Sequence, residues 1–510
     1  MPEPHFRIPL ILLAGLALRL ALSAILPPGY DEAYYTFYGQ HPALSYFDHP
    51  AAVGIWAWAG QRLGGSILAL RLPSLVSYTL ALALLAEATK RWFGQRAALV
   101  SALLGSFCPL LLLCGGVLLL PDSPLLLALA VLLWWLSRHP KVIPGTPAEA
   151  IGLGLILGLV TLGKYHAFLV LLSLLGWCLG SAHRQALYRS PWPALGWLVW
   201  LIVSAPLWLW NIDHGWVSFL FQGGRTDAGV GYSLAAPPLF LLSQLVLLFP
   251  TLGVVLLLAL LPRSGRDRAV AARQLLRWLV LPQLVVFVAL TGRMHVLASW
   301  LVPAWWLLLP LAADWLAGLQ RPRLRPWIVA GGWGTALVLP PLLLTLATQV
   351  RWGVFDPWLP AGLDTSTQLM PPDSLRRGLQ RHPALWKALQ EADLIAANRY
   401  DLPGFLSLAM GRGHGVTFTT FNPDARGFAW WQPADGFRGR TGVVFGLEEP
   451  GKPLVPASWV PWMGSVESLG TVEILRAGRP ALRLAFARFG PLPYPLPRFY
   501  GPRAQAGPLP

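Results

Sequence analysis

Charged residues are scarce in this chain of 510 residues, where they make up 12% against about 25% in an ordinary soluble protein. Hydrophobic residues make up 55%, and the mean hydropathy is +0.53. This balance excludes an ordinary soluble enzyme and an intrinsically disordered chain. It is typical of a membrane protein, and the length allows more than ten spans of about 20 residues plus one modest domain.

Cysteine is also rare. Cys108, Cys114 and Cys178 all lie inside apolar runs, which excludes a disulfide framework and a Cys-based metal site. No tight metal-ligand spacing such as His-x-x-x-His occurs either. We therefore expect neither redox chemistry nor a structural metal.

Long apolar runs, by contrast, are frequent, and they predict about eleven transmembrane helices within residues 1–350. They lie at residues 8–26, 66–89, 97–116, 118–137, 149–163, 166–182, 194–211, 237–262, 275–291, 298–318 and 327–349. The first run could be a secretory signal. No small-residue cleavage site follows it before Tyr30, so we interpret it as a helix.

The positions of the basic residues predict the orientation. With a cytoplasmic N-terminus, the inner loops hold Arg7, Lys90, Arg91, Arg96, Arg138, Lys141, Arg184, Arg189, the cluster from Arg263 to Arg277, Arg321, Arg323 and Arg325. The outer loops then hold only Arg62, Arg71, Lys164, Arg225 and Arg293. This asymmetry predicts a cytoplasmic N-terminus and, with an odd number of spans, a C-terminus on the outer side of the membrane. The net charge of +16 is thus mainly a topology signal, and we expect no nucleic-acid partner.

The composition changes near Arg351 to Gly, Pro, Asp and Arg with short β-rich runs, so residues 351–510 are predicted to form a separate extracytoplasmic domain. Strand-like runs occur at residues 394–397, 416–421 and 441–447, a helix is expected at 402–410, and a hairpin at 471–475 and 481–486. These elements indicate an α/β or α+β module of about 140 residues. The Pro-rich end from Pro491 is expected to be loose.

Ionisable residues at the edge of a membrane are costly, which makes them candidates for function. The predicted topology gathers many of them on the outer face. These are the acids Asp31, Glu32, Asp48, Asp122, Asp213 and Asp227, and the bases His49, Lys164, His166, Arg225, Arg293 and His295.

The first outer loop contains a predicted interfacial helix that begins near Tyr30. Asp31 and Tyr35 share one of its faces, while Tyr34, Phe37, Tyr38 and His41 recur at helical spacing and would lie at the headgroup level. The acidic end would point into a cavity above the bundle. A capping Asp followed by Glu in a first helical turn is the plain structural alternative.

Three further elements lie on the same face. Tyr46-Phe47-Asp48-His49-Pro50 places an acid and a base before the chain re-enters the membrane. Leu120-Pro121-Asp122-Ser123-Pro124 opens a later helix, and an Asp there also has a helix-starting role. Gly163-Lys164-Tyr165-His166 joins two spans, and Lys164 could serve simply as a snorkelling anchor.

These four elements, in this order, resemble bacterial members of the dolichyl-phosphate-mannose protein mannosyltransferase family, glycosyltransferase family 39, to which the aminoarabinose lipid A transferases are related. In the tail, Arg426-Gly427-Phe428 to Trp430-Trp431-Gln432-Pro433 resembles the outer domain of the same group. Where relatives often have His-Pro-Pro or Lys-Pro-Pro, this chain has His49-Pro50-Ala51. That departure weakens the assignment of His49 to phosphate binding.

The resemblance implies a GT-C fold and an inverting enzyme that moves a hexosyl or pentosyl group from a polyprenyl phosphate to an envelope acceptor, which can be a lipid, a glycan or a protein hydroxyl. It assigns Asp31 as the general base, with Glu32 positioning the acceptor or supporting the helix. Lys164 is the first choice for the donor phosphate, followed by His49, Arg293 and His295. Asp48 and Asp122 would line the same cavity, and Tyr165 and His166 belong to the same donor site.

Metal use is left open by the resemblance. A lipid phosphate can be neutralised by Lys and Arg alone, so we expect no cofactor, with a divalent ion at the outer carboxylates and His49 as the less favoured alternative. Phe428, Trp430 and Trp431 could stack on a sugar ring, but core packing is the favoured role.

A transporter or lipid flippase is the main alternative function, although such proteins place charges near the midplane on broken helices. A non-catalytic scaffold that only displays the tail domain is the third candidate function.

Overall fold

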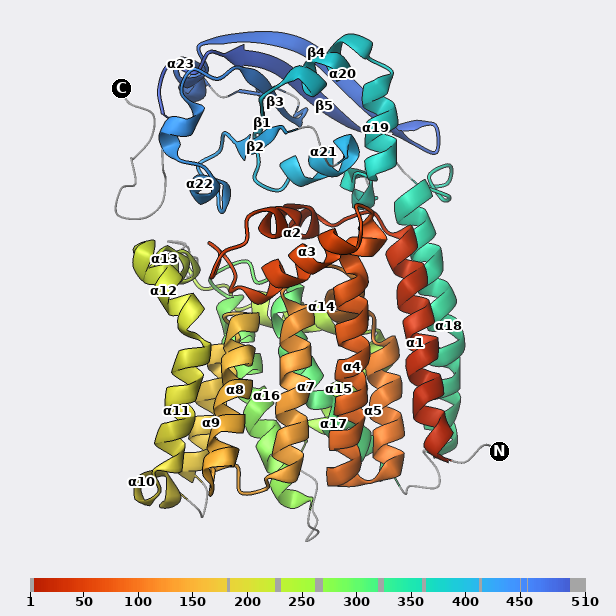
Figure 1. Ribbon diagram of the computed structural model, residues 1–510. Helices are drawn as coiled ribbons and strands as arrows, with labels where there is room; N and C mark the ends of the chain where they lie inside the picture. The colour runs from red at the N-terminus through yellow and green to blue at the C-terminus, as the bar shows by residue number, and fades with distance from the viewer. Residues whose placement is uncertain are drawn as a thin grey trace.

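The structure is a computed structural model that describes residues 4–180, 184–224, 231–261, 269–319, 325–359, 364–411, 415–449, 451–455 and 457–495. A helical bundle forms one part, and a smaller domain that contains a β-sheet covers one end of it (Figure 1). The chain passes from the bundle to the sheet domain after a long helix that ends near residue 352.

The bundle contains a helix at every apolar run expected from the sequence. Its long elements are α1 (Pro4–Ile25), α4 (Ile67–Phe93), α5 (Gln95–Phe107), α6 (Pro109–Leu111) with the π-helix η1 (Leu112–Val117), α7 (Asp122–Arg138), α8 (Pro147–Gly163), α9 (Ala167–Gly180), α11 (Trp192–Val203), α12 (Ala205–Asp213), α14 (Ala236–Leu247), α15 (Pro250–Ala259), α16 (Val270–Leu290), the 3-10 turn η2 (Ala298–Leu301) with α17 (Val302–Ala317), and α18 (Arg325–Trp352). Shorter helices are α2 (Tyr30–Gln40), α3 (Ala52–Leu63), α10 (Ala186–Arg189) and α13 (Val217–Gly224).

Several of these helices are long and apolar enough to cross a membrane, so the chain is a multi-pass membrane protein. Within the described ranges, four helices meet this condition alone, namely α1 from Arg7, α4, α16 and η2 with α17. Three bent pairs, α5 with α6–η1, α11 with α12, and α14 with α15, raise the number to seven. The figure of eleven spans stays a prediction.

The N-terminus and the basic connections lie at the end of the bundle away from the sheet domain. The segments between α4 and α5, between α7 and α8, and around α10 are at this end, while α2 and α3 are at the other (Figure 1). The predicted separation of basic from acidic loops is therefore present in space. Of the loops named in the prediction, residues 225–230, 262–268 and 320–324 lie outside the described part of the chain.

The tail forms an α/β domain around a five-stranded sheet in the order β2-β1-β3-β5-β4. β1 (Leu394–Ala397) pairs in parallel with β2 (Thr417–Thr420) and β3 (Gly442–Leu447), and β5 (Arg479–Gly490) runs antiparallel to β3 and to β4 (Ser465–Arg476). The hairpin is longer than the sequence pattern indicated. Its helical elements are η3 (Thr365–Gln368), α19 (Pro372–Gln380), α20 (Pro383–Glu391), α21 (Pro403–Met410), α22 (Phe428–Trp431), η4 (Ala434–Phe437), η5 (Ala457–Trp459) and α23 (Val460–Met463).

The tail domain packs directly on α2, so the expected placement of that helix at the lipid headgroups is wrong. Tyr34, Phe37 and Tyr38 are at most 2% exposed, and the rings of Phe428 and Trp431 lie against them. The favoured packing role of these two tail aromatics is thus confirmed. These tilted and edge-to-face aromatic contacts give the interface a large apolar area, which fixes the tail on the bundle.

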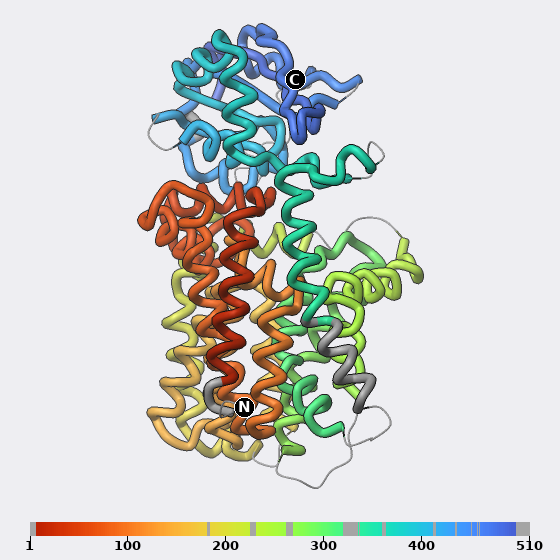
Figure 2. Tube along the Cα trace, turned by 90° about the vertical axis from the view of Figure 1, so that its right-hand side faces the viewer, coloured from red at the N-terminus to blue at the C-terminus, as the bar shows by residue number. Residues whose placement is uncertain are grey.

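A glycine allows the closest approach of the two parts. α21 crosses α2 at Gly404, where a Cβ atom would lie 2.0 Å from the carbonyl oxygen of Ala33, so any side chain there would collide with backbone. Beside this contact, the hydroxyl of Tyr30 donates to the carbonyl of Gln368 at 3.0 Å. The turned view shows the tail above α1, with α18 leading up to it (Figure 2).

Candidate active site

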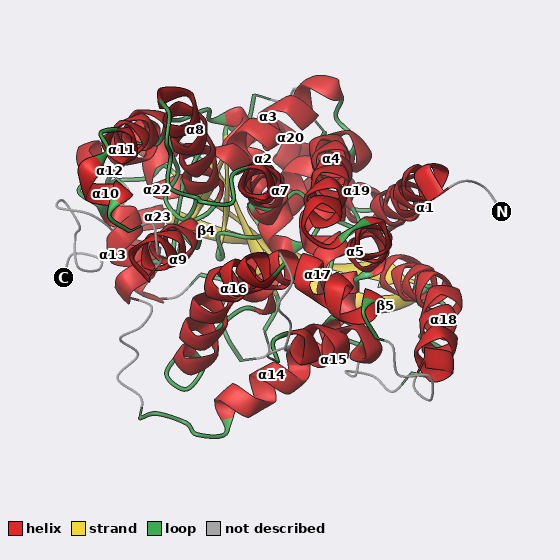
Figure 3. Ribbon diagram, turned by 90° about the horizontal axis from the view of Figure 1, so that it is seen from below, coloured by secondary structure: helices red, strands yellow, loops and turns green. Residues whose placement is uncertain are grey.

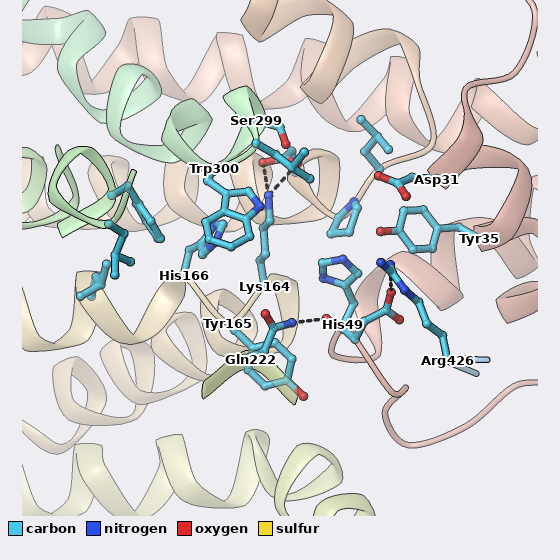
Figure 4. A pocket seen from close by; sticks show the side chains of 18 of the residues that line it. Asp31, Tyr35, His49, Lys164, Tyr165, His166, Gln222, Ser299, Trp300 and Arg426 are labelled. Carbon is cyan, nitrogen blue, oxygen red and sulfur yellow. Dashed lines mark hydrogen bonds and ion pairs between the residues drawn. The ribbon is translucent and has the colours of Figure 1, made fainter. Parts of the chain in front are cut away.

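A cavity of about 440 Å³ lies where the bundle meets the tail domain. Seven of the residues predicted from the sequence line it, namely Asp31, Asp48, His49, Asp122, Lys164, Tyr165 and His166. They come from four separate segments, and their side chains face a common space (Figure 4). The structure therefore brings residues of all four outer motifs together around one cavity.

Asp31 is the carboxylate with the least protein contact in the cavity. It is half-buried in the first turn of α2, and among the described residues it forms no ion pair and no side-chain hydrogen bond. Burial raises the pKa of its carboxyl above the ordinary value, the charge of Arg426 lowers it, and the charge of Asp48 raises it. A carboxylate with free oxygens and a raised pKa is suited to accept a proton from a substrate.

Glu32 does not line the cavity, which corrects the expectation that it shares the catalytic site. The helix turns about 100° per residue, so Glu32 points away from Asp31 and into the protein. Its carboxylate accepts hydrogen bonds from Nη2 and Nε of Arg71 at 2.6 and 2.8 Å, and from the backbone nitrogen of Leu119 at 2.9 Å. Of its two expected roles, the geometry supports the structural one.

Lys164 and Asp122 form a buried ion pair in the wall of the cavity. The ammonium nitrogen lies 3.0 Å from both carboxylate oxygens, and the two residues are 5% and 2% exposed. Gly163 lets the end of α8 reach the start of α7, since a Cβ there would be 2.9 Å from the Cα of Leu125. The close helix contact at Gly163 thus fixes the Lys164 ammonium in the cavity wall. A lysine that only anchors a helix in the lipid headgroups does not need such a fixed position.

Asp48 is held by side chains from distant parts of the sequence. One of its oxygens accepts from Nη1 of Arg426 in the tail at 3.0 Å, and the other accepts from the hydroxyls of Tyr38 and Tyr34. Its backbone carbonyl accepts from the amide of Gln222 at 3.1 Å. These contacts fix the Asp48 carboxylate, so its free capacity for a substrate is smaller than that of Asp31.

Arg426 is the main site residue that the sequence pattern did not single out for the cavity. Its guanidinium lies 3.7 Å from the ring centre of Tyr400, and its backbone φ is +46°, a strained value for an arginine. Although burial lowers it, the Asp48 carboxylate raises the pKa of Arg426 above its ordinary value, so the residue is cationic. The tail motif was visible in the sequence, but nothing local indicated that its arginine reaches Asp48.

The two histidines of the motifs lie against aromatic rings. His49 faces Tyr35 with ring centres 5.4 Å apart, and His166 lies 4.6 Å from Phe287. Tyr35, which shares a face with Asp31 as predicted, also lines the cavity. These rings form an apolar wall beside the ionic groups, of the kind that stacks on a sugar.

Arg293 and His295 do not line the cavity, so the structure contradicts their placement at the donor site. Both are exposed, and only Met294 between them reaches the lining. The turn that follows α16 directs its alternate residues outward. Asp213 is exposed and outside the lining as well, and Arg225 and Asp227 are outside the described residues.

The cavity therefore combines one carboxylate that has no partner among the described residues, Asp31, with two fixed cations. Lys164 is paired with Asp122, and Arg426 is paired with Asp48 and, more loosely, with Asp424. Such cations stabilise negative charge that develops nearby, while the free carboxylate takes up a proton. In the part of the chain that the structure describes, no three His, Cys, Asp or Glu side chains gather as a metal site would need. The expected independence from metals stays a prediction.

Comparison with known proteins confirms the resemblance stated from the sequence. Residues 48–210 match the family model of dolichyl-phosphate-mannose-protein mannosyltransferases, a stretch that includes Asp48, Asp122 and Lys164 but not Asp31 or the tail. No curated protein matches in a sequence search.

Solved structures match over nearly the whole chain. ArnT from Cupriavidus metallidurans in the apo state is 16% identical with a TM-score of 0.62, and the match covers 94% of this chain and 97% of that one. ArnT from the same organism bound to undecaprenyl phosphate is 17% identical with a TM-score of 0.59 and the same coverage. The protein has the ArnT-like GT-C fold, as expected.

A weaker likeness is to the archaeal oligosaccharyltransferase AglB from Archaeoglobus fulgidus, in complex with an inhibitory peptide and a dolichol-phosphate. It is 14% identical with a TM-score of 0.48, and covers 82% of this chain and 65% of that one.

Proposed function

We propose that the protein is an inverting glycosyltransferase that moves a hexosyl or pentosyl group from a polyprenyl phosphate to an envelope acceptor at the outer face of the cytoplasmic membrane. The observation that carries this proposal is the free carboxylate of Asp31 in one cavity with the cation of Lys164. The ArnT-like fold adds support, because one ArnT structure is bound to undecaprenyl phosphate. The family match over residues 48–210 points the same way.

The proposed reaction needs one proton transfer and one displacement. The acceptor hydroxyl gives its proton to the Asp31 carboxylate while its oxygen attacks the anomeric carbon of the donor sugar. The bond between that carbon and the phosphate oxygen breaks, and its electron pair leaves with the polyprenyl phosphate. Attack on the side opposite the leaving group inverts the anomeric configuration.

Lys164 is the proposed partner of the leaving phosphate. Charge grows on the phosphate as the bond breaks, and an ammonium held in place by Asp122 stabilises that charge without having to reorganise. Asp48 and Arg426, locked to each other on another side of the cavity, are suited to bind sugar hydroxyls. The aromatic surfaces of Tyr35 and Tyr400 would hold the ring.

The proposed orientation places the tail domain outside the cell. The basic connections of the bundle lie at the end away from the tail, and cytoplasmic loops are enriched in Lys and Arg. The cavity would then open at the outer leaflet. A transporter would be expected to carry its charged groups near the midplane instead.

Transfer of labelled sugar tests the proposal directly. Purified protein in lipid vesicles is given a panel of labelled polyprenyl-phosphate sugars and native envelope material, and the product is identified. Asp31→Asn keeps the shape and removes the base, so turnover should fall by a factor on the order of 100 or more. Asp393→Asn, a change of the same kind at an exposed carboxylate of the tail outside the cavity, is the matched control.

The outcomes separate the functions. Transfer by wild type and Asp393→Asn, with loss in Asp31→Asn, supports both the reaction and the base. Full activity of Asp31→Asn would contradict the assignment of the base. Movement of the intact labelled lipid across the bilayer, without any new glycosidic bond, would favour the flippase.

A further inference from the structure

A second hollow lies at the opposite end of the bundle, along the contact between α9 and α16. This groove has a volume of about 830 Å³, and it is lined by the end of α9, the start of α16 and the segment that joins α7 to α8. The view from below shows these two helices near the middle of that face (Figure 3). Nothing in the proposed reaction uses it.

The groove is positively charged where it opens. Lys141 and Arg277 line it, and none of the described residues in its lining is acidic. Nη2 of Arg277 donates to the carbonyl of Leu261 at 3.0 Å, and its guanidinium makes no other hydrogen bond to the described residues. The side chain of Lys141 is exposed and likewise has no partner in the described part of the chain. Two donors are therefore left for an anion.

The rest of the groove is apolar and faces outward. Trp177 from α9 and Trp278 and Leu281 from α16 line it, and Trp278 and Leu281 are 46% and 42% exposed. Trp278 lies across α9, since a Cβ at Gly176 would be 3.1 Å from its ring. Tryptophan prefers the membrane interface, so these residues mark the level where headgroups meet acyl chains.

We propose that this groove binds an anionic phospholipid from the leaflet at that end of the bundle. Lys141 and Arg277 bind its phosphate, and Trp177, Trp278 and Leu281 contact its acyl chains. Basic pockets between transmembrane helices are suited to such headgroups. A zwitterionic lipid would bring its own cation toward the two side chains and bind less well.

The position of the groove argues against the polyprenyl donor as its occupant. α9 begins beside the cavity, where His166 and Leu169 line it, and ends at the groove with Gly180. Its 14 residues span about 20 Å at 1.5 Å per residue, so a phosphate in the groove is that far from Asp31 and Lys164. α16 likewise carries Phe287 and Leu290 of the cavity at its other end. A lipid that fills the groove would brace both helices that form the cavity wall.

Lipid retention measured by native mass spectrometry tests this proposal. The protein is purified from vesicles of phosphatidylglycerol and phosphatidylcholine, and the phosphatidylglycerol that stays bound is counted. Lys141→Gln with Arg277→Gln should weaken its retention about 30-fold, from the typical contribution of two cations near a membrane surface. The control, Arg184→Gln with Arg189→Gln, removes two exposed charges at the same end of the bundle that do not line the groove.

One bound phosphatidylglycerol per protein in wild type and control, lost in the groove variant, is the expected result. Equal retention by groove variant and control would overturn the proposal, as would equal retention of phosphatidylcholine. Preferential binding of polyprenyl phosphate would overturn the assigned occupant. If the double variant fails to fold, Lys141→Gln alone should still fold, because this side chain is exposed, and it should lower retention about fivefold.

Discussion

The neighbouring residues Asp31 and Glu32 provide a sharp test of the structure, because their substitution should change different properties. Replacing Asp31 should lower turnover, and replacing Glu32 should lower stability. Asp31 faces the cavity and has no partner among the residues that the structure describes, whereas Glu32 is 2% exposed and bound to Arg71. Asp31→Asn should lower turnover by a factor on the order of 100 or more and leave the unfolding temperature unchanged or slightly higher. Glu32→Gln should lower the unfolding temperature, and its activity should fall only in proportion to the fraction of protein that is unfolded.

The expected size of the Glu32 effect follows from its contacts. Its two oxygens accept four hydrogen bonds, from Nε and Nη2 of Arg71, from the nitrogen of Leu119 and from the nitrogen of Gly29. Arg71, which is fully buried, would lose its counter-charge while it still donates to backbone carbonyls at the end of α1. Breaking a buried pair by removing one partner costs about 3–5 kcal/mol.

A double-mutant cycle in detergent measures the coupling between the two residues. Unfolding is followed for Glu32→Gln, Arg71→Gln and both together, with the transfer assay run on the same samples below the transition. The double variant should be less destabilised than the two single effects added, by about 1–3 kcal/mol. Additive effects, or a Glu32→Gln protein that unfolds like wild type yet is inactive, would refute the structural role and return Glu32 to catalysis.

Two further predictions concern the cations of the cavity. Arg426 lowers the pKa of Asp31, and its loss also leaves the charge of Asp48 unpaired, which raises that pKa further. Arg426→Gln should therefore move the acid limb of the pH–rate profile to higher pH, because the base becomes protonated at a higher pH. Each profile is scaled to its own maximum, and an unmoved limb would show that Arg426 does not act on the base. Lys164→Gln in an Asp122→Asn background removes the pair without leaving a buried charge. Relative to Asp122→Asn alone, it should lower kcat/KM for the polyprenyl-phosphate sugar about 10- to 100-fold, as expected for one charge-assisted hydrogen bond to the phosphate. Unchanged kcat and KM would reduce Lys164 to a structural partner of Asp122.

Most of the secondary structure could be predicted because it is a local property. Each apolar run became a helix, and the short β-rich runs at 394–397, 416–421 and 441–447 became strands of one sheet. Hydrophobic periodicity and turn residues act over a few positions, so they are visible without the fold. The bends were not predicted. α14 and α15 meet at 119°, where Pro250 follows Phe249 in an apolar stretch that looked continuous.

The gathering of the site could be predicted for a different reason. A membrane has two faces, so counting spans places each outer loop with the others, and Asp31, Asp48, Asp122 and Lys164 were assigned to one face in this way. The same argument failed within a loop. Arg293 and His295 are on that face, but they do not line the cavity. The prediction failed here because topology assigns a loop to a face and says nothing of the direction of its side chains.

What the sequence determined by itself is therefore the helices, the strands, the two parts of the chain and the face on which charged groups gather. Only the tertiary structure decided which charges are paired. Glu32 meets Arg71 across 39 positions, and Asp48 meets Arg426 across 378. A buried charge is costly without a counter-charge, and the chain can supply that partner from any distance in sequence. Within the described part of the chain, the fold brings a cation to Glu32, Asp48 and Asp122 but none to Asp31, and no local pattern records that difference.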